Sequence, residues 1–405
     1  MSFVIWQSQN HAKPIKAPYF PPKLIKRDIN WQGELKAMNF ALQIGKIAGI
    51  PIRLHITFLA IIPVVAYLFG TFSQLVYGKP YGFGAVEPLE LRWIYSLAFS
   101  ILLFTCVVLH ELGHSFVAMR YGIKIKSITL YILGGVASME DIPRDPAKEL
   151  KMAIAGPLVS GVIGAGCILL SNPSATILGE VHPLTTLLWS LGIINLILMI
   201  FNLIPAFPMD GGRVLRAWFA TRMPYAAATT RAANIGKMFA IAMGLLGFLS
   251  INVFLILIAF FVYIGASEED KATSISVTLD GIKVKDMMSS DVRTVAPETY
   301  LRDLVEMMFR EKHRGYPVVQ AEKLVGIVTI SDVQKVPDPM RASTTVGQVM
   351  NKKIYVIRPE DEATDAMKKM AERQIRRLPV LENERLVGIL SRSDLLRAIE
   401  ICSGW

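Results

Sequence analysis

Two histidines and a glutamate stand together at residues 110–114, where the sequence reads HELGH. Residues four positions apart lie on the same face of an α-helix, so His110 and His114 can direct their imidazoles at one point. This H-E-x-x-H spacing suits a bound zinc ion with Glu111 beside its water molecule. Because so short a motif also occurs by chance, the surrounding sequence must show whether it is a metal site.

The motif ends an apolar stretch that is long enough to cross a membrane. Residues 93–109 carry no charge, and the apolar character continues to Tyr121, which predicts a membrane-spanning helix. A charged side chain near the bilayer centre costs about 2.5–3.5 kcal/mol on insertion scales, so such a charge usually serves a function. These surroundings favour a zinc site within the membrane.

A catalytic zinc site takes three protein ligands and keeps one position for water. Asp210 is the preferred third ligand, because it ends another apolar stretch, FNLIPAFPMDGGR, and two glycines after it allow close packing. Alternatively, Asp210 caps the helix that follows. Glu149 and Glu180 are the other acidic candidates, and a ligand from either would indicate another type of membrane zinc peptidase.

The reaction also needs a base and a donor for the developing negative charge. Zinc lowers the pKa of bound water from about 16 to about 7, and Glu111 can take this proton and pass it to the leaving amine. Asn202, two helical turns before Asp210, can donate to the oxyanion. Asn195 lies near the same face but deeper, and either asparagine can instead form hydrogen bonds between helices.

The composition is that of a membrane core between a basic arm and a soluble tail. Of the 405 residues, 52% are hydrophobic and 19% are charged, and the mean hydropathy is +0.42. Residues 1–53 carry eight Lys or Arg and two acidic residues, whereas 268–405 carry 22 of each. A basic arm beside a membrane faces anionic lipid, so no nucleic-acid partner is expected.

The fold class predicted from these patterns is an α-helical polytopic membrane protein. A basic arm with short strands, 1–53, precedes a domain of six spans, 54–267. The spans are expected at about 54–77, 93–121, 150–170 and 184–206, with two more in 235–264, separated at Ser250-Ile251-Asn252. If the N-terminus is cytoplasmic, only Lys79 and Arg92 of the 13 basic residues between 54 and 267 lie outside, as the positive-inside rule favours.

Two stretches beside the spans predict strands. Residues 42–53 alternate enough for one or two short strands before the membrane. The sequence KIKSITLYILGGVASME, between the second and third spans, predicts a β-hairpin near the membrane surface. Such a hairpin can offer an edge strand to an extended peptide, or it can be a plain connection.

The tail contains one unit twice, at a spacing of 62 residues without a gap. Matching positions include Pro317 with Pro379, Gly326 with Gly388, and Asp332 with Asp394. A fixed period means two copies of one supersecondary unit. Each copy predicts helix, strand, strand and helix, so an α/β tail of two repeats is expected at 280–340 and 341–402.

The membrane part resembles the site-2 protease family of intramembrane zinc metalloproteases from about Ile44 to Ile264. The resemblance is carried by HELGH together with N-x-x-P-x-x-P-M-D-G, and also by AGP at 155–157 and by GGVAS. It implies a transmembrane protein or peptide substrate whose helix partly unwinds before cleavage. The implied roles are zinc ligands His110, His114 and Asp210, catalytic base Glu111 and oxyanion stabiliser Asn202.

The two tail copies resemble CBS domains in the segments GIVTISD and GILSRSD. A CBS pair implies a cleft for ATP, ADP or AMP, with arginines as bidentate phosphate donors. The implied ligand residues are Asp332 and Asp394 at the ribose, Thr329 and Ser391 at the phosphate, and Arg314, Arg376 and Arg377 as neutralising cations. Alternatively, the pair is structural or joins two chains in a homodimer, and its Asp and Ser residues cap helices.

These patterns together predict a multi-pass intramembrane zinc protease of the cell membrane, with its N-terminus and CBS pair in the cytoplasm. Nucleotide binding to the pair is expected to alter substrate access. A transporter or channel gated by CBS domains is the alternative from another class, and it gives Glu111 no role. A catalytically silent scaffold is a third interpretation.

Overall fold

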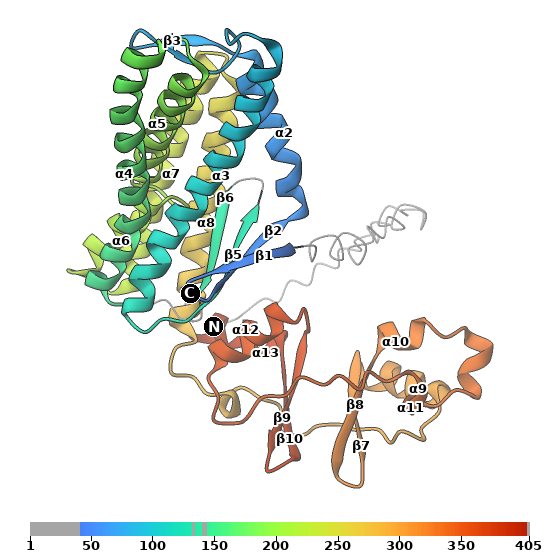
Figure 1. Ribbon diagram of the computed structural model, residues 1–405. Coiled ribbons are helices and arrows are strands. Elements are labelled where there is room, and N and C mark those ends of the chain that lie inside the picture. The colour runs from blue at the N-terminus through green and yellow to red at the C-terminus, as the bar shows by residue number, and fades with distance from the viewer. Residues whose placement is uncertain (1–40, 132–133, 140–143, 403–405) are drawn as a thin grey trace, which may run out of the picture. The chain divides into compact units, whose positions relative to one another are not determined.

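The computed structural model describes residues 41–131, 134–139 and 144–402 (Figure 1). The first 40 residues of the predicted basic arm, 1–53, therefore lie outside the described residues. Contacts within the chain define two units, each built from separate stretches of the sequence. Among the described residues, the first comprises those up to 139 together with 159–196, and the second comprises 144–158 together with 197–402.

The first unit is built on apolar helices, which pack through aromatic and small residues. These elements are α2 (Ile56–Thr71), β3 (Gln74–Val76), β4 (Lys79–Tyr81), α3 (Leu89–Arg120), most of α4 (Pro146–Leu178) and most of α5 (Pro183–Asn202). Phe99 of α3 is fully buried in one cluster with Phe83 and with Leu187 of α5. A Cβ added at Gly192 would lie 2.7 Å from the Ile168 side chain, so small residues let α4 and α5 approach closely.

Large apolar side chains also cover the outer faces of these helices. Exposed examples are Leu97 and Ile101 on α3, and Val162 and Leu169 on α4. Soluble proteins rarely expose contiguous apolar surface on this scale, and lipid chains are the solvent that suits it. The helices therefore have membrane-facing surfaces, as the sequence predicts.

Four described helices are long and apolar enough to cross a membrane, namely α3, α4, α5 and α7 (Tyr225–Leu249). Helix α2 is apolar but has only 16 residues, and α8 (Val253–Thr278) contains the acidic run at 268–270. The predicted helical membrane fold is thus confirmed, whereas the count of six spans stays a prediction.

A four-stranded sheet packs against α3. Its strands are β1 (Ala41–Ile47), β2 (Ile50–His55), β5 (Ile125–Tyr131) and β6 (Gly134–Met139), in the order β1-β2-β5-β6. Both predicted strand regions are confirmed, but the parallel pairing of β2 with β5 that joins them was not predicted. Ile52 and Ile128 pack with Leu112, so the sheet lies against the helical turn that carries the HELGH motif.

The membrane part of the second unit contains α6 (Asp210–Ala220), α7 and α8, together with the first turns of α4. Helix α7 ends at Leu249, and α8 begins at Val253 after Asn252, whose side-chain oxygen accepts a hydrogen bond from the Leu255 amide at 3.1 Å. The predicted break in the last apolar stretch is therefore present, and it is an N-cap that starts a new helix.

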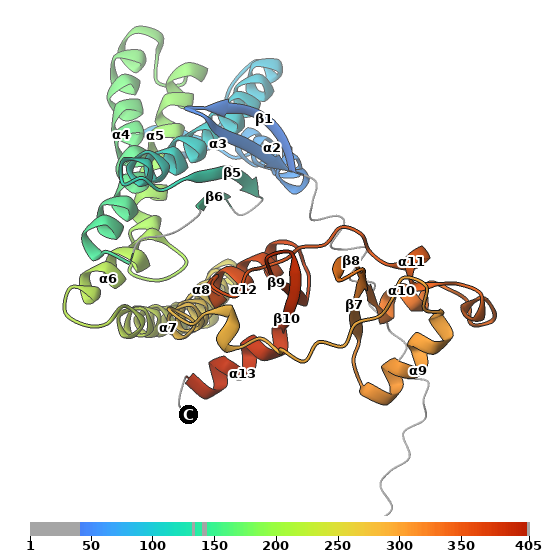
Figure 2. The ribbon, with the colours of Figure 1, turned by 90° about the horizontal axis from the view of Figure 1, so that it is seen from below.

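The tail forms two similar repeats that share one sheet, ordered β7-β8-β10-β9. Figure 2 shows α9, α10 and α11 beside β7 and β8, with α12 and α13 beside β9 and β10. The first repeat has α9 (Leu301–Glu311), β7 (Gly315–Gln320), β8 (Lys323–Thr329) and α10 (Ile330–Gln334). The second has α12 (Ala363–Glu372), β9 (Arg377–Glu382), β10 (Arg385–Ser391) and α13 (Arg392–Cys402), preceded by α11 (Val346–Val349).

The two repeats exchange their first segments. Val284, at the start of the first repeat, is buried in the core of the second repeat, whereas Val346, at the start of the second, is buried in the core of the first. Backbone hydrogen bonds hold each exchanged segment, from the Val284 amide to the Asp361 carbonyl and from the Val346 amide to the Thr299 carbonyl. Because each core needs a segment from the other copy, the two repeats fold as one module.

Candidate functional site

Helix α3 places the two histidines of the HELGH motif one turn apart on its buried face. His110 is 4% exposed and His114 is 6% exposed, and their Nε2 atoms lie 3.2 Å apart. Two nitrogens that each lie about 2.0–2.1 Å from a tetrahedral zinc ion are separated by about 3.4 Å. The imidazole pair therefore has the spacing expected for two ligands of one zinc ion.

Ser160 of α4 orients the first of these imidazoles. Its Oγ lies 2.9 Å from Nδ1 of His110, and the serine is fully buried. When Nε2 faces a metal, Nδ1 carries the hydrogen and donates it to the serine oxygen, which fixes the ring and its tautomer. Sequence reasoning did not single out Ser160, although a hydroxyl in an apolar span is a signal for a bond between helices.

Asp210 is the first residue of α6. Met209 occupies the N-cap position and its side chain makes no capping hydrogen bond, so Asp210 lies in the first turn of the helix and not at the cap position that the alternative assignment gave it. A Cβ added at Gly211 would lie 2.1 Å from the Ile204 carbonyl oxygen. Only glycine permits so close an approach, and this approach sets where α6 begins.

One group of possible metal ligands among the described residues has the same members as the ligand set that the sequence implies, whose zinc-binding role stays a prediction. His110, His114 and Asp210 each offer one ligand atom, and these atoms lie within 4.8 Å of one another. Asp210 is 9% exposed, so the group is shielded from bulk water. Two imidazole nitrogens and one carboxylate oxygen form a donor set that suits zinc and leaves one position for water.

The rival acidic ligands lie elsewhere among the described residues. Glu149 accepts a hydrogen bond from Nε of Arg216 at 2.8 Å, and Glu180 is exposed after the end of α4. Neither belongs to the group that the structure forms around the imidazoles.

The predicted base, Glu111, lies against strand β6. A Cβ added at Gly135 would lie 2.6 Å from Cγ of Glu111. Glu111 is half-buried, so the backbone of β6 reaches this side chain only because residue 135 is a glycine. Sequence reasoning noticed the Gly134-Gly135 pair as a hairpin signal, but it did not connect Gly135 with Glu111.

The two asparagines of α5 differ in their surroundings. Asn195 is fully buried and donates to the Leu191 carbonyl at 2.8 Å. Asn202 is partly exposed and donates to the Leu198 carbonyl at 3.0 Å. An amide carries two hydrogens, so this bond leaves Asn202 one hydrogen for a ligand, and its oxyanion role stays a prediction.

In the tail, the predicted ribose and phosphate residues bond to each other. Oδ2 of Asp332 accepts from the amide and hydroxyl of Thr329, at 3.1 and 2.6 Å. Oδ2 of Asp394 accepts from the amide and hydroxyl of Ser391, at 2.8 and 2.7 Å. The capping role that the sequence analysis left open is therefore present at the start of α10 and α13, and the ligand role stays a prediction.

The predicted arginines gather at the boundary between the repeats. A Cβ added at Gly315 would lie 2.8 Å from Nη1 of Arg377, so the guanidinium from the second repeat lies on the backbone of the first. Burial lowers the pKa of Arg377, and the nearby charges of Arg314 and Arg376 lower it further, against the opposing effect of Asp394. An anion placed here would offset this repulsion.

Two family models match this chain. The model of peptidase family M50 matches residues 98–176 and 175–247, which include the HELGH motif and Asp210. The model of the CBS domain matches residues 284–338 and 346–401, which are the two repeats of the tail.

Similar proteins extend over most of the chain. It is 40% identical over 364 residues to "Zinc metalloprotease MJ0392" of Methanocaldococcus jannaschii, covering 90% of this chain and 97% of that protein. It is 28% identical to "Putative zinc metalloprotease Rip3" of Mycobacterium tuberculosis, covering 90% and 94%. Among solved structures, "Site-2 Protease from Methanocaldococcus jannaschii" is 43% identical over 57% of this chain and 95% of that one, with a TM-score of 0.40.

Proposed function

The chain belongs to peptidase family M50, and from this premise we propose that it cleaves transmembrane segments of membrane-tethered proteins inside the bilayer. It is a multi-pass, site-2 protease-type zinc metalloprotease with two CBS domains. The observation that carries the proposal is the group of His110, His114 and Asp210, which could hold a metal ion through three ligand atoms.

Each residue of the proposed site has a separate role in peptide-bond hydrolysis. Zinc, when bound by the two imidazoles and Asp210, supplies the activation of a water molecule and polarises the scissile carbonyl. Glu111 accepts the proton of the attacking water and passes it to the leaving amine. Asn202 donates its remaining amide hydrogen to the carbonyl oxygen as negative charge develops there. Ser160 keeps the His110 ring in orientation through the whole cycle.

Strand β6 is the proposed docking edge for the substrate. It is the last strand of the described sheet, and Gly135 brings its backbone against Glu111. A substrate segment that unwinds and pairs with β6 gains backbone hydrogen bonds in place of its helical ones. Pairing at this edge would bring an extended peptide beside the base.

Gly135→Ala is expected to lower kcat by about 100-fold, because a methyl group at this position must displace Glu111. Gly45→Ala in β1 of the same sheet is the matched control, since a Cβ there meets no atom within 4 Å. The prediction is tested by measuring the cleavage rate and the zinc content of both purified variants. Wild-type cleavage by Gly135→Ala would contradict the proposed contact between β6 and the base.

The proposed substrate class is tested in cells. Membrane-protein fragments are compared between cells carrying the intact chain and cells carrying Glu111→Gln. Fragments cut within apolar segments, present only with the intact chain, would identify substrates. If the two cell types yield identical fragments, the proposal of intramembrane cleavage fails.

We also infer that the CBS pair binds an adenine nucleotide, and that this binding regulates cleavage. The support is the crowded group of Arg314, Arg376 and Arg377, in which burial and the two like-charged neighbours lower the pKa of Arg377. Phosphate groups of ATP, ADP or AMP would neutralise this group as charge-assisted hydrogen-bond acceptors. Asp332 and Asp394 remain the proposed ribose partners.

Arg377→Ala is expected to weaken nucleotide binding by about 10- to 100-fold, the usual value of a hydrogen bond to a charged group. Calorimetric titration of the full chain in detergent with AMP, ADP and ATP measures it. Arg385→Ala is the control, because Arg385 is exposed on β10 and pairs with Glu322. Equal nucleotide affinity in both variants would contradict the assignment of Arg377.

The proposed topology places the N-terminus and the CBS pair in the cytoplasm. Its support is the charge asymmetry of the sequence, in which only Lys79 and Arg92 lie on the outer side of the core. Both residues belong to one end of the first unit, in β4 and in the first turn of α3. A homodimer through the CBS pair stays a prediction.

A further inference from the structure

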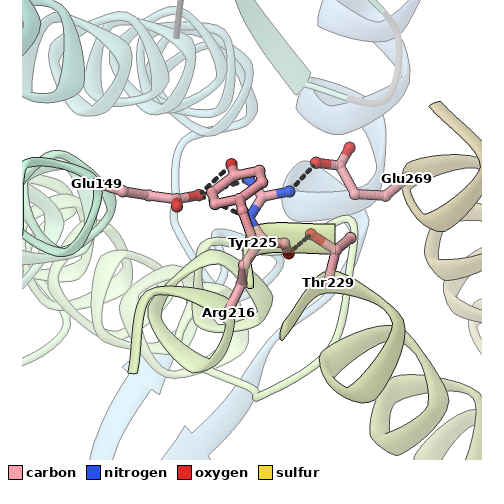
Figure 3. A network of polar contacts seen from close by, with 5 residues as sticks. All are labelled: Glu149, Arg216, Tyr225, Thr229 and Glu269. Atoms are coloured by element: carbon pink, nitrogen blue, oxygen red, sulfur yellow. Dashed lines mark hydrogen bonds and ion pairs between the residues drawn. The ribbon is translucent and has the colours of Figure 1, made fainter. Parts of the chain in front are cut away.

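A buried arginine stands on the same short helix as Asp210. Arg216, in α6, is 3% exposed. Its Nε donates to Oε1 of Glu149 at 2.8 Å, and its Nη1 donates to Oε1 of Glu269 at 2.6 Å. Figure 3 shows the guanidinium between the two carboxylates, which come from α4 and α8.

The same guanidinium lies between two aromatic rings. Its central carbon is 5.0 Å from the ring centre of Phe207 and 5.0 Å from that of Tyr225. Phe207 belongs to the short connection that leads into Asp210, and Tyr225 begins α7. Arg216 therefore contacts two other helices, the start of a third, and the segment that delivers the metal ligand.

We propose that Arg216 is a positioning residue for Asp210, and that Glu269 is its support from α8. By fixing both α6 and the connection before it, Arg216 holds the Asp210 carboxylate in the orientation that a metal ligand needs. The proposal rests on the proposed function, because it assumes that Asp210 is a zinc ligand.

Stability alone does not account for this arrangement. Two charges that leave water lose hydration energy, and apolar residues of similar volume often stabilise a buried position as well as an ion pair does. A guanidinium bonded to carboxylates on two helices instead fixes the orientation of its own helix relative to those two, because its donors lie in one rigid plane. Such control of orientation suits Asp210, which is the first residue of α6.

Helix α8 supports the same region at a second point. A Cβ added at Gly265 would lie 2.6 Å from Cδ of Pro208, so α8 packs closely against the connection before Asp210. Gly265 and Glu269 are four residues apart and thus share one face of the helix. At the end of α8, Ile275 packs against the core of the second CBS repeat, and the C-cap residue Leu279 belongs to that core. Helix α8 is therefore a continuous physical link between that repeat and the support of Asp210.

The neighbouring residue on α8 provides a matched control. Asp270 accepts from Nζ of Lys237 at 3.2 Å and from the Thr230 hydroxyl at 2.8 Å, so it joins α8 to α7 rather than to α6. Glu269→Gln and Asp270→Asn each remove one carboxylate charge from one ion pair of α8. Only the first weakens the support of Arg216.

The experiment measures zinc affinity of the full chain in detergent by competition with a chelator, and thermal unfolding of the zinc-free forms. Glu269→Gln and Arg216→Lys are expected to bind zinc about 10- to 100-fold more weakly, as is usual when the groups that orient a ligand are lost. Asp270→Asn is expected to keep wild-type zinc affinity. The unfolding temperature of Asp270→Asn shows how much stability is lost when a carboxylate of α8 that does not contact Arg216 is removed.

The outcomes separate the two proposals. If Glu269→Gln and Asp270→Asn bind zinc equally, Arg216 is a structural residue only, and the positioning role is overturned while the proposed function stands. If the wild-type chain binds no zinc, the proposed function itself fails. Should Arg216→Lys not fold, Glu269→Gln still decides, because its side chain is 34% exposed and its loss leaves Arg216 paired with Glu149.

Discussion

Glu111→Gln is expected to lower kcat for peptide-bond cleavage by about 10²- to 10⁴-fold, the range that a positioned general base contributes. Glutamine has nearly the same shape as glutamate but cannot accept the proton of the attacking water. The side chain is half-buried beside His110 and against the backbone of Gly135, so its replacement leaves the packing of α3 and β6 intact. Bound zinc is expected to stay at the wild-type level.

The measurement is cleavage of a transmembrane peptide by the purified chain, with metal content determined on the same samples. Glu90→Gln is the matched control, because Glu90 lies on the same helix and is exposed in its first turn. Full activity of Glu111→Gln would remove this residue from the reaction. Loss of activity together with loss of zinc would instead make Glu111 a structural support of the metal site.

His114→Ala and Asp210→Asn are each expected to reduce bound zinc from about one ion per chain to almost none, because a site with three protein ligands cannot spare one. Both residues are buried, with His114 6% and Asp210 9% exposed, so their atoms belong to a site that is shielded from bulk water. Cleavage is expected to disappear in parallel, because the water is no longer activated.

Metal analysis after dialysis against a weak chelator checks this expectation. His182→Ala is the control for general loss of histidine, since His182 is exposed between α4 and α5. The informative case is Asp210→Asn. If this variant keeps its zinc with wild-type affinity, the third ligand lies elsewhere, and the group formed by the two imidazoles and Asp210 has another purpose.

The structure contains a physical connection between the tail and the support of Asp210. Helix α8 joins the core of the second CBS repeat to the connection and the arginine that support Asp210. A nucleotide that binds the tail more tightly in one arrangement of α8 shifts the chain toward that arrangement. Regulation would then act on the geometry of a zinc ligand, in addition to any effect on substrate entry.

Much of the site could be predicted from the sequence because its parts are local. The helical repeat places His110 and His114 on one face of α3 whatever else the chain does. The 62-residue spacing predicts the order of elements in both CBS repeats, and the structure follows it, since α9 begins at Leu301 and α12 at Ala363. The break before α8 was also predicted, at Ser250-Ile251-Asn252.

Residues that act through distant contacts were missed, because no local pattern marks them. Ser160 is one of several small residues in α4, and only packing shows that it faces Nδ1 of His110. Gly135 reads as part of a turn until its backbone is found against Glu111. Arg216 reads as a surface charge of an amphipathic helix, yet it is buried between two carboxylates.

The sequence by itself therefore determined the chemistry of this protein: a pair of imidazoles with a carboxylate beside them, apolar helices around them, and a doubled α/β tail. Spacing within one helix and periodicity along one chain are enough for that, because both depend on bonds between near neighbours. The tertiary structure alone decided which other distant groups meet, including β2 alongside β5, Ser160 at His110, and Arg216 between α4 and α8. Contacts between distant residues depend on the packing and desolvation of whole helices and strands. No short stretch of the sequence contains enough information to predict them.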